Sequence, residues 1–449
     1  MNATANVLRI RRHTPSAHAA VFALKALFVA VKFPSVIFLG ALTAMLFRPP
    51  DLKAFPIDRV FFVVLLAAIA LRLVTTRDRL HTYPATWPML ALLLLSLRGV
   101  LAQSYQPQAW SLFAAKWLVP FMLFHIAGNI FREENSLRKL ETFSLVVLLY
   151  LTVVAVLFLF DVGTLIFPRF ILDEGIGIHA DRARGPFLQA VANGVSISIL
   201  ELLALHSFER GRLRRVLAMA LFAGVPLALL ATRTRAVWFA AAAAAILLMF
   251  FGSSRKVRQA CAVLCVLGSV GLCLFVIYRA DSNSLTDRLQ DRSPVDFRLD
   301  MYQAGWQMFT EKPIMGWGSE GQIQPEVARR ISNFHPEYYL FHNTYLELAV
   351  ERGILGLGLY AWLVISLFQL ARAPACGYEG EATFLGRSFR KMWPLVLVVY
   401  FLNASAVVMN YQFVNGFVFT LAGILSAQNY RTQASIERHN ARFENRVYQ

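Results

Sequence analysis

Charged residues are scarce in this chain: they make up 16% of its 449 residues, whereas 57% are hydrophobic. A soluble protein of this length carries about a quarter charged residues. Apolar runs of about 20 residues recur along the whole chain, which is the length that a helix needs to cross the hydrocarbon of a bilayer. The composition therefore excludes a soluble globular protein and indicates a membrane protein with many spans.

Cysteine is also rare, and its placement excludes two common uses. The chain has four cysteines, and three of them fall within one apolar span, which fits neither a disulfide framework nor a zinc site. No Asp-x-Asp triplet occurs, and the spacing of Asp287, Asp291, Asp296 and Asp300 resembles the solvated face of a loop helix more than a divalent-ion site. No small-residue cleavage site follows the first apolar stretch, so we expect it to be kept as a span. We expect no metal and no cofactor.

Positive charge is in excess, with a net charge of +17. No soluble basic domain is present to hold a nucleic acid, so we expect no such partner. In a membrane protein this excess collects in short cytoplasmic loops beside anionic lipid headgroups. One set of connections is much the richer in Lys and Arg, near residues 9–12, 77–79, 132–139, 210–215, 255–258 and 387–391 and in the tail after 429. We therefore place both termini in the cytoplasm of an inner-membrane protein.

The apolar pattern predicts an all-α polytopic membrane protein with about twelve transmembrane helices. The spans lie near residues 22–47, 57–75, 86–103, 109–130, 142–161, 187–206, 214–232, 235–252, 259–278, 345–371, 392–410 and 412–428. Lys25, Lys32 and Pro34 can divide the first into an interfacial helix and a short span. We therefore expect transmembrane helices over 1–278, a periplasmic loop region over 279–344, further transmembrane helices over 345–428 and a basic cytoplasmic tail over 429–449.

Arginine and histidine gather at the face opposite the basic loops. The residues are His179, Arg182, Arg184, Arg233, Arg235, Arg288, Arg292, Arg298, His335 and His342. The topology rests on charges at the other face, yet it brings all of these residues to one side. Guanidinium forms paired hydrogen bonds to phosphate oxygens, and imidazole can accept a hydroxyl proton near neutral pH. The pattern predicts an extracytoplasmic site for a diphosphate whose lipid tail stays in the bilayer.

These residues also have structural interpretations, which stay open at this point. Arg233 can reach to the interface, and Arg288 and Arg292 alternate with aspartates with which they can form local ion pairs. His335 precedes a proline and fits a loop. His342 fits either a capped helix start or a catalytic base; at a helix N-terminus the charged imidazolium is disfavoured, which leaves the neutral form that a base requires.

Polar and small residues within the spans are similarly ambiguous. Arg98 and Lys116 lie inside or near spans, where they can line a cavity or extend to the interface. Gly353, Gly356 and Gly358 lie on one predicted helix, and we expect them to allow close helix packing.

One motif stands at the start of that helix. The stretch HNTYLELAVERGILG begins with His342 and Asn343, continues through nine residues to Gly353, and reaches Gly356 after two more. It resembles the H-[NSQ]-x9-G-x-x-G signature of bacterial O-antigen ligases.

Two weaker motifs support this resemblance. Residues 298–318 contain an Arg, an aromatic-rich helix and a P-x-x-G-x-G element at Pro313, Gly316 and Gly318. This arrangement is similar to that of the wider O-antigen ligase and polymerase family. Residues 234–238, TRAVW, are similar to the family's S-R-G-x-W, with Thr and Ala in place of Ser and Gly.

The resemblance implies a metal-independent, inverting glycosyltransferase of the membrane GT-C class. Such an O-antigen ligase moves O-antigen from undecaprenyl diphosphate to a sugar hydroxyl of lipid A–core at the periplasmic face, among membrane lipids. His342 would deprotonate or orient that hydroxyl. The arginines implied to bind the diphosphate are Arg184, Arg235, Arg298 and Arg288.

Three alternatives remain at this stage. An O-antigen polymerase would use the same donor to extend a second lipid-linked glycan. A protein O-oligosaccharyltransferase would use a Ser or Thr of a pilin, and we expect such proteins to be longer, with an extra domain. A lipid-linked glycan transporter would carry charges near the bilayer midplane and repeated halves, whereas no repeat is apparent in this sequence.

Overall fold

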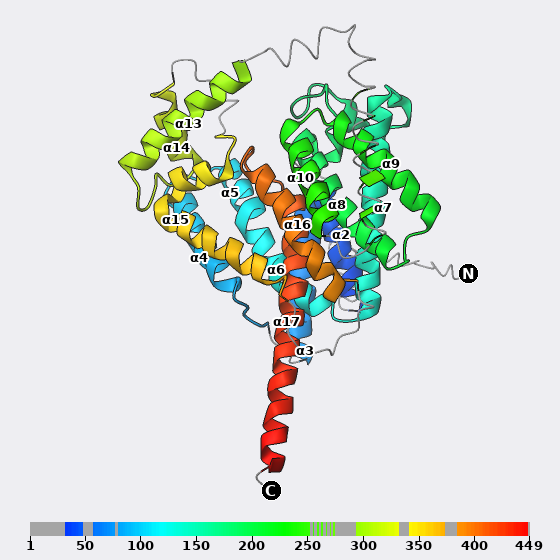
Figure 1. The fold of residues 1–449 in the computed structure, drawn as a ribbon. Helices are drawn as coiled ribbons and strands as arrows, with labels where there is room; N and C mark the ends of the chain where they lie inside the picture. Colours follow the sequence, from blue (N-terminus) through cyan, green and yellow to red (C-terminus); the bar gives the residue numbers. More distant parts are fainter. Residues whose placement is uncertain are drawn as a thin grey trace, which may run out of the picture.

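The computed structural model of the chain is built from helices (Figure 1). It describes residues 32–47, 57–76, 80–251, 293–331, 341–372 and 384–447, with isolated positions between 255 and 273. No strand occurs in these residues, so the predicted all-α class is confirmed. Arg288, Arg292, His335 and most of the predicted span 259–278 lie outside the described residues.

Most described helices coincide with predicted spans. They include α2 (Pro34–Leu46), α3 (Ile57–Thr76), α4 (Thr86–Leu101), α8 (Ala190–Glu209), α9 (Arg215–Ala231), α10 (Arg235–Phe251), α15 (Thr344–Gln369) and α16 (Arg387–Ala404). Four helical stretches of the described chain are long and apolar enough to cross a membrane, namely 107–130, 134–159, 190–209 and 344–369. Shorter apolar helices accompany them, which supports a multi-pass helical protein and leaves the count of twelve a prediction.

Two helices extend beyond their predicted limits. α7 (Glu134–Leu159) begins ahead of the apolar run, where Arg138 Nη2 pairs with Glu134 Oε1 at 2.7 Å across one helical turn. α17 (Gln412–Val447) continues through the predicted tail, because no proline or glycine follows Gly423 to end it. Its last part projects away from the other helices (Figure 1).

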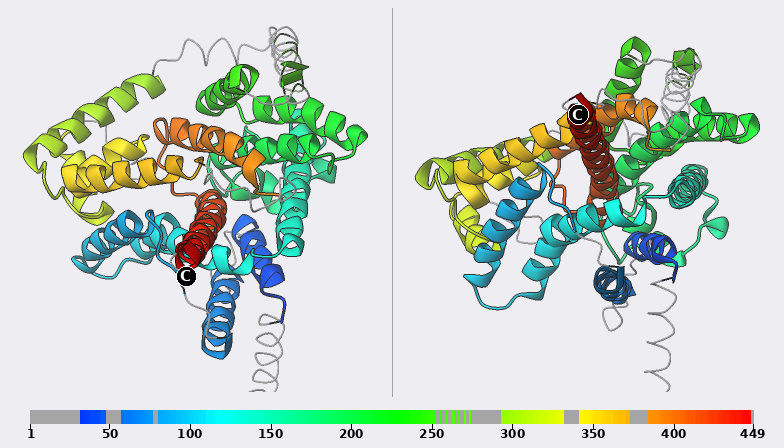
Figure 2. Two further views of the ribbon diagram at one scale, coloured as in Figure 1. Left: turned by 60° about the horizontal axis from the view of Figure 1, so that its bottom comes forward. Right: turned by 90° about the horizontal axis from the view of Figure 1, so that it is seen from below.

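The span 107–130 is interrupted by a widened turn. It consists of α5 (Pro107–Phe113), the π-helical turn η1 (Ala114–Leu118) and α6 (Val119–Ile130). Pro120 has no N–H, and in a regular helix its ring would clash with the carbonyl of Lys116. The π turn relieves this clash and places Lys116 on the widened turn. α6 packs along α17, and the two lie side by side in both views of Figure 2.

Two faces of the molecule carry the connections that bear on the site. At one, which we call the basic face, Arg210 Nη1 lies 3.1 Å from Glu141 Oε1, and Arg431 Nη2 donates to the Gly128 carbonyl at 2.8 Å. The other, the histidine face, carries the loop 161–189, the junction 231–235, α13 (Ser293–Glu311), α14 (Glu320–Ala328) and the start of α15. The helices α13 and α14 lie at the opposite end of the molecule from the C-terminus (Figure 1).

Candidate active site

The HN pair of the motif forms the entry to α15. Asn343 is its N-cap, and its side-chain oxygen accepts hydrogen bonds from the N–H groups of Tyr345 at 2.9 Å and Leu346 at 3.1 Å. Two donors that a helix start leaves without a partner are thereby satisfied. His342 has φ of 50°, a left-handed conformation that few residues with a side chain adopt. Asparagine thus begins the helix, and histidine is held in the bend before it.

Three segments far apart in the sequence meet at His342. Burial, followed by the charges of Arg298 and His179, lowers the pKa of the His342 imidazole to about 4. Arg298 comes from α13, and His179 comes from the loop between α7 and α8. Tyr302 on α13 also donates a long hydrogen bond, 3.4 Å, to the backbone carbonyl of His342. The imidazole is therefore neutral at neutral pH, as expected, with burial as the main cause.

This pKa predicts an unusual pH dependence for any reaction that uses His342 as a base. A free imidazole becomes protonated below about pH 6.5, whereas the half-buried imidazole of His342 stays neutral until the pH falls toward 4. The acid limb of a pH–rate profile should accordingly lie near pH 4. Between neutral pH and about pH 5, protonation of His342 should cause no loss of rate. In Arg298→Gln the limb should move to higher pH because one nearby positive charge is removed. A limb near pH 6.5 in the unmodified protein would contradict this geometry.

The two glycine motifs interlock. Gly353 kinks α15 with φ 65° and ψ −161°, and the turn 313–318 that follows α13 fits into the kink. The turn donates two hydrogen bonds to α15, from Trp317 N to Val350 O at 2.8 Å and from Gly318 N to Glu351 O at 3.1 Å. It accepts two from α15, at Pro313 O from Ile354 N at 2.7 Å and at Ile314 O from Leu355 N at 3.4 Å. The turn therefore satisfies the amides and carbonyls that the kink removes from the helical ladder.

Backbone contact explains why glycines stand at this junction. A Cβ atom at Gly353 would lie 2.3 Å from the Ile314 oxygen, and one at Gly316 would lie 2.4 Å from the backbone carbon of Glu351. The predicted close helix packing is therefore wrong at Gly353, where the backbone that approaches closely belongs to a turn and not to another helix. At Gly356 the nearest atom is the Arg352 Cβ of the same helix. Gly358 has open space around it, so the packing prediction is wrong there.

Arg184 is buried inside the first loop of the histidine face. It is 1% exposed, and its guanidinium donates to the carbonyls of Ile171 at 3.0 Å, Ile176 at 2.5 Å and Asp173. These bonds close the loop that leads to His179. Arg184 is thus placed to position this loop, and its direct contact with a diphosphate stays a prediction.

The junction between α9 and α10 is bound to the same loop. Arg233 also has a left-handed backbone conformation, with φ of 48°. Its Nη1 lies 3.7 Å from Asp181 Oδ2. The Ala183 N–H donates to the Ala231 carbonyl at 2.9 Å. Arg235 begins α10 with an exposed side chain. The structure thus brings His342, Arg298 and His179 together, with the loop of Arg184 joined to the junction that carries Arg235.

Residues 217–361 of the chain match a family model described as O-antigen ligase. They contain Arg235, Arg298, His342 and both interlocking glycine motifs. This segment is similar to the O-antigen ligase family. The resemblance drawn from the motifs is therefore confirmed, and the family covers O-antigen ligases and polymerases, which are glycosyltransferase-like enzymes. No curated protein matches the chain.

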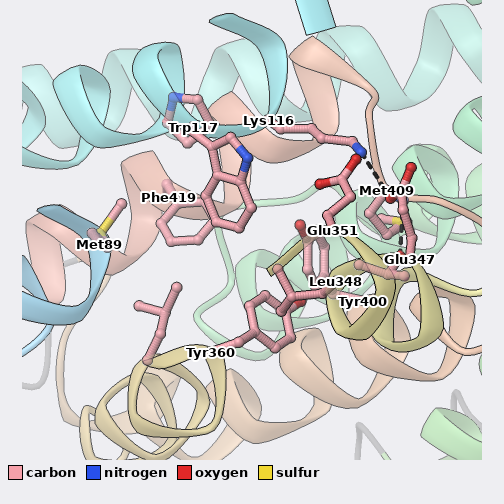
Figure 3. A pocket seen from close by; sticks show the side chains of 13 residues that line it. Met89, Lys116, Trp117, Glu347, Leu348, Glu351, Tyr360, Tyr400, Met409 and Phe419 are labelled. Carbon is pink, nitrogen blue, oxygen red and sulfur yellow. Dashed lines mark hydrogen bonds and ion pairs between the residues drawn. The ribbon is translucent and has the colours of Figure 1, made fainter. Parts of the chain in front are cut away.

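The matched segment 217–361 also contributes acidic residues to a cavity between the helices (Figure 3). Lys116 Nζ lies 2.7 Å from Glu347 Oε2, with both side chains largely buried, and Glu351 faces the same cavity. The cavity interpretation of Lys116 is thus confirmed. The sequence analysis did not identify Glu347 and Glu351 as candidate site residues. Two carboxylates four residues apart on an apolar helix are themselves a signal of a functional site. The aromatic lining consists of Trp117, Tyr360, Tyr400 and Phe419.

Proposed function

We propose that this protein is an O-antigen ligase. It transfers O-antigen from undecaprenyl diphosphate to a sugar hydroxyl of lipid A–core, at the periplasmic face of the inner membrane, with both termini in the cytoplasm. The observation that carries the proposal is the meeting at the start of α15 of His342 and Arg298, both in the segment that matches the O-antigen ligase model, with His179 from the loop before that segment. The histidine face is then the periplasmic face.

The proposed reaction is a single displacement. Neutral His342 accepts the proton of the acceptor hydroxyl, and the hydroxyl oxygen forms a bond to the anomeric carbon of the donor sugar. The bond from that carbon to the diphosphate oxygen breaks, and the undecaprenyl diphosphate leaves with the bonding electrons. Attack from the side opposite the leaving group inverts the anomeric configuration.

Arginine supplies the positive charge for the leaving group in this mechanism. Guanidinium stays charged and forms paired hydrogen bonds to phosphate oxygens, so it can stabilise the diphosphate without a metal ion. Arg298 is near enough for its charge to lower the pKa of His342, and Arg235 lies on the same face. Arg288, in the segment before α13, would join them, and Arg184 would act by positioning the loop of His179.

A purified-protein assay tests the proposal against the nearest alternative. The protein is mixed with undecaprenyl-diphosphate O-antigen and lipid A–core in the presence of a chelator, and the core is followed by gel mobility. We expect the core to shift to a ladder of long glycans. An unshifted core beside a longer lipid-linked glycan would identify a polymerase instead. If neither product forms, the ligase proposal fails for these substrates.

A further inference from the structure

A second polar cavity lies on the histidine face beside the interlocked glycine motifs. It has a volume of about 240 Å³ and lies between α4, the turn 313–318 and the kink of α15. Its polar lining is formed by Arg98, Lys312, Trp317, Gln322, Glu351 and Arg352. Apart from Glu351, which also faces the cavity of Lys116, none of these side chains has a part in the site around His342.

Positive charge dominates this cavity. Three cationic side chains, from Arg98, Lys312 and Arg352, face a single carboxylate, that of Glu351. The carboxylate lies 3.7 Å from Arg352 Nη2, and Arg98 forms no ion pair with any residue that the structure describes. Two positive charges are thus in excess, and their mutual repulsion favours binding of an anion between them.

The cavity is built on rigid backbone. Arg352 is 4% exposed, and its Nη1 donates to the Gly318 carbonyl at 2.9 Å, so the guanidinium is tied to the turn that forms one wall. Gly99 on α4 leaves the room that this guanidinium fills, since a Cβ there would lie 2.7 Å from Arg352 Nη1. Lys312 Nζ lies 3.6 Å from the centre of the Trp317 ring, which fixes the ammonium beside the opening. Such fixed donors need little rearrangement to bind a ligand.

We propose that this cavity binds a phosphate group carried by a glycan substrate. A phosphate monoester has a charge of about −1.5 to −2 at neutral pH, which matches the two excess positive charges. Guanidinium and ammonium are the side chains that bind such oxygens best. The identification of the ligand as a glycan phosphate rests on the proposed ligase function. The phosphate can come from the acceptor core or from the diphosphate of the donor.

Binding of inorganic pyrophosphate tests the site without any need for transfer. The full-length protein in detergent is titrated calorimetrically, and Arg98→Gln/Lys312→Gln is compared with Arg329→Gln. The side chains of Arg98 and Lys312 are exposed at the opening, so the double variant should fold, which its elution volume and thermal midpoint will check. Arg329 is the matched control, an exposed cation directly after α14 that lies outside the cavity.

We expect the double variant to lose one pyrophosphate-binding event, or to weaken it by about tenfold, while Arg329→Gln binds like the unmodified protein. Arg298→Gln should affect only a separate event at the site of His342. Absence of pyrophosphate binding to the unmodified protein would overturn the proposal, as would equal binding by the double variant and Arg329→Gln. If the double variant weakens pyrophosphate binding and Arg298→Gln leaves it unchanged, the result counts against the proposed active site and not against this cavity.

Transfer kinetics then distinguish the two sources of phosphate. If the acceptor core supplies it, the double variant should raise the acceptor KM by about tenfold, and chemical removal of phosphate from the core should abolish the difference. If the donor supplies it, the donor KM should rise instead. Unchanged KM values for both substrates would overturn the role in substrate binding. If the unmodified protein transfers nothing, the ligase function fails, and pyrophosphate binding alone decides whether the cavity is an anion site.

Discussion

Replacing His342 by alanine is expected to reduce glycan transfer by about two to four orders of magnitude, the usual effect of losing a general base. The neutral imidazole at the entry to α15 is the group that accepts the proton in the proposed reaction. Asn343 would still cap the helix through Tyr345 and Leu346, so the fold should survive the substitution. Initial rates of core modification, measured at equal amounts of folded protein, check the result.

Two further variants separate chemistry from structure at this position. His342→Gln keeps a hydrogen-bonding side chain that cannot accept a proton, and it should lose nearly as much activity as His342→Ala. His81→Ala is the matched control, because this histidine stacks on Tyr430 at the basic face, 4.5 Å between ring centres. It should transfer at a near-normal rate. Near-normal transfer by His342→Ala would remove the histidine from the mechanism.

Replacing Gly353 by alanine is expected to destabilise the domain by about 3 kcal/mol or more and to abolish transfer. Its backbone lies in a region of φ and ψ that is essentially restricted to glycine, where a side chain costs about 1–3 kcal/mol. The new Cβ would also meet the Ile314 oxygen at 2.3 Å. The turn 313–318 would have to separate from α15, leaving backbone groups without partners. The thermal midpoint in detergent, together with the transfer rate, measures both effects.

Gly358→Ala provides the comparison on the same helix. Nothing lies within 4 Å of a Cβ at Gly358, and alanine favours a helix over glycine by about 0.5–1 kcal/mol. This variant should be as stable as the unmodified protein or slightly more so. Equal destabilisation by the two substitutions would mean that the interlocking of the turn with the kink does not explain the motif.

The sequence predicts much of this fold because span length and loop charge depend on local composition. Apolar runs gave limits close to those of α3, α4, α10 and α15, and the alternation of charged loops predicts which helix ends share a face. At α17 the apolar run marks only the predicted span, because the end of an apolar run does not end a helix. Only a residue such as proline or glycine does so, and none follows Gly423.

The sequence predicts several residues of the candidate site, but it does not predict how they are arranged in space. The motifs single out His342 and Arg298, but only the folded chain shows that His179 joins them and that burial accounts for most of the lowered pKa. Arg184 has the same sequence appearance as the other arginines, yet it is bound to loop carbonyls. Contacts of this kind depend on the packing of distant segments, which local sequence patterns do not encode.

The anomeric configuration of the new glycosidic bond tests the central claim most directly. In the proposed mechanism His342 activates the acceptor hydroxyl for a single displacement at the donor sugar. Nuclear magnetic resonance of the product, made by the purified protein from a donor of known anomeric configuration, should therefore show an inverted linkage to the core. A retained configuration would require a covalent or otherwise double displacement and would contradict this account.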